Sequence, residues 1–72
     1  MNSFEIMKNT LKSYLNWATV NPNCATAFYT MAQGFAMGAV MALAACNNDM
    51  SQEIEDLWNN ELDPAFKALV AQ

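Results

Sequence analysis

The chain has 72 residues, of which 54% are hydrophobic and 14% charged, and it contains no His. A chain of this length forms a single domain, residues 1–72, and its small core needs self-association or another staple to be comfortably stable. The net charge is −4 with only three Lys or Arg residues, which argues against nucleic-acid binding, because that function needs a basic surface to neutralise phosphates.

An amphipathic helix is predicted for about residues 3–19. Apolar side chains recur there at three- and four-residue steps, while most polar side chains fall on the other side. Asn2 and Glu5 have the spacing of a capping box at its start. Pro22 should end this helix, because a proline disfavours helical geometry at the residue before it.

A long second helix is predicted for about residues 22–46, with Asn21 as its cap. No charge occurs between Cys24 and Cys46, and a helix that is apolar all round is normally surrounded by protein or lipid. Such a helix would hold the two Cys Cα atoms about 33 Å apart, too far for a disulfide, so we expect free thiols that are buried and act as small hydrophobes. Antiparallel pairing of two copies would bring Cys24 of one near Cys46 of the other.

Small residues form a ridge along one side of this helix. Gly34 and Gly38 have the GxxxG spacing that lets two helix backbones approach closely. Each glycine costs about 1 kcal/mol of helix stability, which a close contact must offset. We therefore expect an oligomer interface made of Thr30, Gly34, Gly38, Met41, Ala42 and Ala45. In the alternative, the C-terminal helices fold back over the ridge and the protein is a monomer.

The other side of the same helix is apolar and is expected to face the rest of the chain; it consists of Phe28, Ala32, Ala36, Ala39, Val40 and Leu43. We expect Met31, Met37 and Met41 to fill the core, with an adaptable binding groove as the alternative role. Trp17 and Trp58 are expected to close the ends of the core, and exposed anchors for a partner are the alternative.

Two short helices are predicted after a break at residues 47–49, over about residues 51–61 and 64–71, with Pro64 starting the second. Six carboxylates gather in this region and form a candidate acidic surface for recognising a protein partner; they are Asp49, Glu53, Glu55, Asp56, Glu61 and Asp63. A solvated helix face is the alternative role of these residues. The fold class is therefore all-α: a small helical bundle with one long central apolar helix, completed by oligomerisation.

The sequence contains few of the side chains that enzymes use for catalysis. The absence of His removes the commonest general base and metal ligand, and the clustered carboxylates have no apolar pocket that would raise a pKa for acid catalysis. The chain also lacks a glycine-rich phosphate loop and a calcium-binding loop. We expect no enzymatic activity, no cofactor and no metal.

The leading functional hypothesis is a cytoplasmic homo-oligomer, a dimer or larger, that acts as a binding or inhibitor protein. In size, acidity and lack of catalytic groups the chain is similar to small accessory proteins of phages and mobile elements, which bind and block a host factor. The alternative is a single-span membrane protein with its N-terminus in the cytoplasm, modulating a membrane complex or permeabilising the bilayer. A third hypothesis is an oligomer that holds a small ligand between subunits through Gln33, Tyr29 and Lys12.

Overall fold

The structure, a computed structural model, describes residues 3–72, and within that range it contains helices and no strand. The elements in chain order are α1 (Ser3–Val20), the 3₁₀ turn η1 (Pro22–Cys24), α2 (Ala25–Ala45), α3 (Met50–Leu57), the π-helical turn η2 (Trp58–Leu62) and α4 (Asp63–Val70). The predicted all-α fold is confirmed, with the first two helices close to their expected bounds. Asn2, the proposed partner of Glu5 in a capping box, lies outside the described residues.

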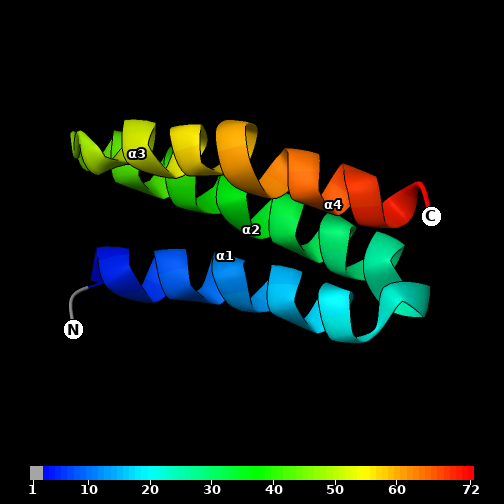
Figure 1. Cartoon of the computed structure of the whole chain (residues 1–72). Helices are drawn as coiled ribbons and strands as arrows, with labels where there is room; N and C mark the ends of the chain where they lie inside the picture. The colour runs from blue at the N-terminus through cyan, green and yellow to red at the C-terminus, as the bar shows by residue number, and fades with distance from the viewer. Residues whose placement is uncertain (1–2) are drawn as a thin grey trace.

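The helices form three layers, and each layer runs antiparallel to the one before it in the chain. Helix α1 runs in one direction, α2 returns beside it, and α3, η2 and α4 run back along α2 in the direction of α1 (Figure 1). The buried core draws on all three layers, and its members are Leu11, Ala18, Ala25, Ala32, Ala36, Ala39, Leu43, Ile54, Leu57, Leu62 and Phe66. The side of α2 predicted to face the chain is therefore the side that packs.

The turn between α1 and α2 differs from the prediction in one detail. Asn21 makes no side-chain cap hydrogen bond to the following helix; its side-chain amide instead donates to the Trp17 carbonyl oxygen at 3.2 Å. The helical path restarts at Pro22, whose missing N–H costs nothing at that position.

The end of α2 is set by Asn47, which has a φ of 54°. This left-handed conformation suits Asn and lets two amides close the helix in a Schellman motif. The Asn48 N–H donates to the Leu43 carbonyl oxygen at 2.9 Å, and the Asn47 N–H donates to that of Ala44 at 3.0 Å. The polar run after Cys46 thus ends the helix by a specific geometry.

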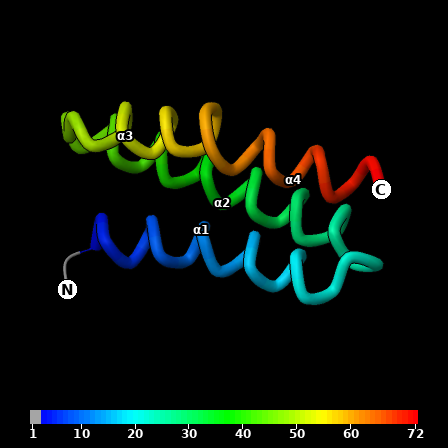
Figure 2. Tube along the Cα trace, viewed as in Figure 1, coloured from blue at the N-terminus to red at the C-terminus, as the bar shows by residue number. Residues whose placement is uncertain are grey.

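The C-terminal region forms one continuous helical rod from Met50 to Val70, visible as an uninterrupted coil in Figure 2, where two separate helices were expected. The expected break is replaced by η2, in which the Asp63 N–H donates to the Trp58 carbonyl oxygen, five residues back. Such a wider turn relieves the clash that a proline, here Pro64, makes with the preceding turn of an α-helix.

The π turn also keeps the apolar stripe of the rod in phase. The buried residues Ile54, Leu57, Leu62 and Phe66 are separated by three, five and four residues. Steps of three and four suit an α-helix, but a step of five would rotate Leu62 and Phe66 away from α2. One π turn absorbs the extra residue, so both halves of the rod face the same core.

Candidate functional site

The most extensive candidate surface is the outer face of α2. Of its 21 residues 12 are exposed, and none of them is charged. All six residues of the predicted oligomer interface lie on this face. A Cβ atom added to Gly34 or Gly38 would meet nothing within 4 Å. The C-terminal rod therefore packs along α2 but leaves the ridge uncovered, which contradicts the alternative in which it folds over the ridge.

The methionines of α2 lie outside the core, and the expectation that they fill it is wrong. Met31, Met37 and Met41 are 53%, 60% and 69% exposed. The one hydroxyl among the ridge residues, that of Thr30, donates to the Thr26 carbonyl oxygen of its own helix at 3.0 Å, so it offers little polarity to the outside. The outer face thus combines flexible apolar side chains with small residues between them.

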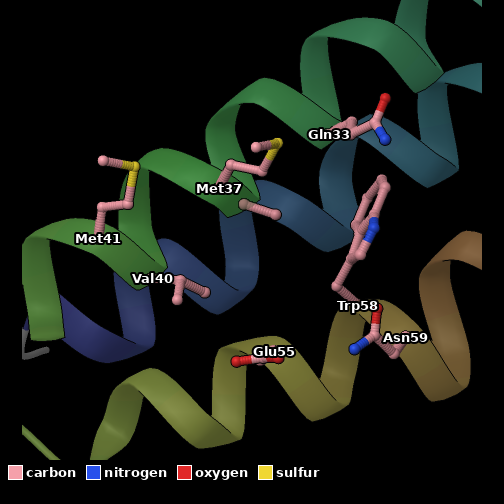
Figure 3. A pocket seen from close by; sticks show the side chains of 8 residues that line it. Gln33, Met37, Val40, Met41, Glu55, Trp58 and Asn59 are labelled. Carbon is pink, nitrogen blue, oxygen red and sulfur yellow. The ribbon is translucent and has the colours of Figure 1, made fainter.

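A groove of about 350 Å³ lies where this face meets the C-terminal rod. Figure 3 shows Met37, Met41 and Val40 on α2 opposite Glu55 and Trp58 on α3 and η2. Gln33, Ala36 and Asn59 complete the lining. Methionine and tryptophan side chains give the groove an adaptable apolar floor, and Glu55 gives it one carboxylate.

The six acidic residues do not form one surface. Glu53, Asp56 and Glu61 line a second groove of about 320 Å³, opposite Lys8 and Lys12 of α1. Glu55 borders the methionine groove on another side of the rod, and Asp49 stands before α3.

Asp63 does not belong to the exposed acidic surface, because its side chain packs against α2 and is largely covered. Its carboxylate accepts a hydrogen bond of 2.5 Å from the Tyr29 hydroxyl and lies 3.0 Å from the Lys67 Nζ, and its side chain is only 20% exposed. The Tyr29 hydrogen bond and then Lys67 hold the pKa of Asp63 below its usual value of 3.8. The same contacts raise the pKa of Tyr29 and of Lys67. This link joins α4 to α2 and is structural.

The link was missed at the sequence level. The i,i+4 spacing of Asp63 and Lys67 on a helix was a readable signal for an ion pair. The hydroxyl of Tyr29 is 34 residues away from Asp63, and only the packing of the rod on α2 brings them together.

Two groups of aromatic rings hold the layers to α2. Tyr29 stacks on Trp58 and Phe66 with ring centroids 5.9 and 5.5 Å apart. On the other side of α2, Trp17 lies 6.0 Å from Phe28. Trp17 is 50% exposed and Trp58 is half-buried, so each closes one edge of the core and also shows a ring edge to solvent.

The residues proposed to hold a small ligand are dispersed. Gln33 borders the methionine groove, Lys12 lines the second groove, and the Tyr29 hydroxyl is bonded to Asp63. Both thiols, Cys24 and Cys46, are free as expected, but the expectation that they are buried is wrong, because both residues are exposed. Among residues 3–72, no three His, Cys, Asp or Glu side chains are placed to share a metal ion.

One helical stretch, Pro22–Ala45, is long and apolar enough to cross a membrane, and 22% of its most apolar window is buried in the bundle. Comparison with family models, curated proteins and solved structures finds no match to this chain.

Proposed function

We propose that the protein is a non-enzymatic, self-associating binding protein of the inhibitor or accessory type, acting in the cytoplasm. The observation that carries this proposal is the methionine groove, because flexible thioether side chains and an exposed tryptophan edge suit the capture of an apolar segment. The absence of His and the downward shift of the Asp63 pKa favour binding over acid or base catalysis.

The partner class follows from the charges around the groove. Glu55 lies in the groove, whereas Asp56 lies on another side of the rod, in the second groove. Lys8 and Lys12 line the other groove of the rod, beside α1, and Lys67 is paired with Asp63. A helix with an apolar stripe and basic flanks would place apolar side chains on Met37 and Trp58 and its cations near Glu55.

A fluorescence titration tests this binding mode. Trp17→Phe leaves Trp58 as the only tryptophan, so its emission reports on the methionine groove. A synthetic amphipathic Leu/Lys helix should shift this emission saturably, and a Leu/Glu helix should not. Glu55→Lys should weaken binding at least tenfold.

The matched control reverses one carboxylate away from the groove, Glu61→Lys, and changes the net charge equally. It should retain most of the affinity. Equal losses in the two variants would mean general charge attraction without use of the groove, and that outcome contradicts the proposed recognition mode.

Self-association is proposed on the uncovered outer face of α2. Gly38→Leu is the sharp variant, because its new side chain has open space in the single bundle and would obstruct a close helix pair. Light scattering should give a discrete oligomer for the native chain and a smaller particle of intact helicity for the variant. An equal monomer mass in both would rule out this interface.

The membrane alternative is carried by the length and exposure of Pro22–Ala45. A span would require α1 and the C-terminal rod to leave α2, because Lys12, Glu53 and Asp56 would otherwise stand beside it in hydrocarbon. Extraction only in detergent, with no soluble folded species, would support the span and overturn the cytoplasmic binding protein.

A further inference from the structure

The outer face of α2 is patterned symmetrically about the level of Ala36. Glycines stand two residues before and after Ala36, methionines five residues before and after, and alanines nine residues before and after. The exposed residues that make up this pattern are Ala27, Thr30, Met31, Gly34, Gly38, Met41, Ala42 and Ala45. Along the middle of the face these residues give the same succession of small and long side chains in either direction, with Thr30 and Ala42 as a further small pair. Met37 and Gln33, towards the edge beside the C-terminal rod, lie outside this pattern.

We propose that a second copy of this chain covers the outer face of α2, with the two α2 helices antiparallel about a two-fold axis level with Ala36. This arrangement rests on the self-association proposed above and specifies its geometry. A two-fold interface puts each residue opposite its symmetry counterpart, so Gly34 meets Gly38 of the second copy and Met31 meets Met41.

The positions of the long side chains fit this pairing. At about 100° per residue, Met31 and Met41 fall on opposite sides of the line that runs along the middle of the face. In the antiparallel pair, Met31 and the second copy's Met41 therefore lie side by side at one level instead of colliding. Between them, Gly34 and Gly38 leave room for the backbones to approach.

Area and charge favour a second copy as the occupant. The 21 residues of α2 extend about 31 Å, and half the surface of a helix about 10 Å wide over that length is roughly 500 Å². Two copies would bury up to roughly 1,000 Å² together, which is the lower limit for a specific interface. A charged partner would lose hydration against this face without gaining an ion pair, whereas a second α2 is equally uncharged.

The arrangement also places the binding grooves. The two-fold axis lies in the interface and is perpendicular to both α2 helices. Each long edge of the outer face therefore lies beside the same edge of the second copy. The two C-terminal rods then lie along one edge of the dimer and the two α1 helices along the other. Both grooves lined by Met37 and Glu55 open on the same side, so one partner with two basic apolar segments could occupy both.

The native cysteines report on the register. Cys24 of one copy and Cys46 of the second lie on the same edge of the face and differ by about 3 Å along the helix axis. Two Cys24 residues, or two Cys46 residues, are roughly 30–36 Å apart in the same dimer. Both thiols are free and exposed, so a short bis-maleimide can reach them.

The test is cross-linking of dilute protein with that reagent, read by intact mass alongside light scattering. The native chain should give covalent dimers, and Cys24→Ser and Cys46→Ser should each give none alone. Mixing the two variants should restore a dimer with a single link, since one copy supplies each thiol. Gly38→Leu, with both thiols kept, is the control and should lose the cross-link.

Each other outcome is decisive. Cross-linking of a single variant with itself would indicate a parallel pair and overturn the antiparallel register. A dimeric mass without a cross-link in the native chain would overturn the register while leaving self-association intact. A monomeric mass at all concentrations would overturn the self-association as well.

Discussion

Asp63 accepts a hydrogen bond from Tyr29 and pairs with Lys67, so this one carboxylate holds α4 to α2. The sequence alone placed Asp63 with five other carboxylates on one acidic surface. The exposure and partners of each side chain separate them: Glu55 borders the methionine groove, and Asp63 is a structural residue.

The Tyr29, Asp63 and Lys67 link predicts a specific pH dependence. The folded chain lowers the pKa of Asp63 below 3.8, so the unfolded chain binds protons first, and this contribution to stability is lost as the pH falls below that value. The pKa values of Tyr29 and Lys67 are raised above 10.0 and 10.5, so their contribution is lost as the pH rises past 10.

Asp63→Asn should therefore lower the free energy of unfolding by about 1–2 kcal/mol at pH 7, allowing for its partial exposure. The difference from the native chain should shrink towards pH 2 and again above pH 11, as followed by urea unfolding. Asp49→Asn, which removes a carboxylate without a cap hydrogen bond, serves as the control. A difference that stays constant with pH would contradict the assigned role of Asp63.

The two sides of helix α2 have different surroundings. One side, with Ala32, Ala36 and Leu43, packs in the core, and the other exposes glycines and methionines. Gly34 and Gly38 each weaken an isolated helix by about 1 kcal/mol relative to alanine and contact nothing within the bundle. In the proposed dimer, the close approach of two helices at these glycines would offset this cost.

Gly34→Ala and Gly38→Ala should consequently have opposite effects on folding and on association. In dilute protein each should raise the melting temperature by about 4–8 °C, because helix propensity improves by about 1 kcal/mol. In concentrated protein each should weaken dimerisation at least tenfold, measured by sedimentation equilibrium. Thr26→Ala, away from the ridge, should change association little. Stabilisation without weaker association would show that the ridge is a free surface.

The C-terminal rod depends on its π turn to keep two apolar stripes in register. Deleting Asn60 removes the extra residue, and Pro64→Ala then permits a regular α-helix in which Leu57 and Leu62 are four residues apart. This double change should keep the melting temperature close to that of Pro64→Ala alone. The control deletes Asp56 in place of Asn60, again together with Pro64→Ala, and so displaces Ile54 from the apolar stripe. This deletion should lower the free energy of unfolding by about 2 kcal/mol or more, measured by unfolding followed by circular dichroism.

At the scale of the whole molecule, a 72-residue bundle that exposes half of its central helix should gain stability from its own concentration. For a dimer that unfolds to two chains, each tenfold increase in concentration above the dissociation constant adds about 1.4 kcal/mol per dimer.

The melting temperature should therefore rise by roughly 3–6 °C per tenfold increase in protein concentration, measured by calorimetry from micromolar to millimolar chain. Gly38→Leu should remove the dependence, because it obstructs the proposed interface without disturbing the bundle. A melting temperature that does not change with concentration in the native chain would contradict dimerisation at these concentrations.

The sequence by itself determined the helical class, the bounds of the first two helices and the side of α2 that packs, because these depend on local periodicity and on Pro22 and Asn47. Steps of three and four residues select an α-helical face without any knowledge of its partner. The sequence also identified the small-residue ridge around Gly34 and Gly38, because that pattern is contained within one helix.

Only the tertiary structure decided where the methionines and the carboxylates lie. Met31, Met37 and Met41 are as apolar as core residues, and their exposure follows from how much of α2 the two flanking layers can cover. Asp63 leaves the acidic surface because the rod brings it to Tyr29, a contact between distant parts of the chain. Hydrophobicity and charge are properties of single residues, whereas burial depends on which elements are available to pack against them.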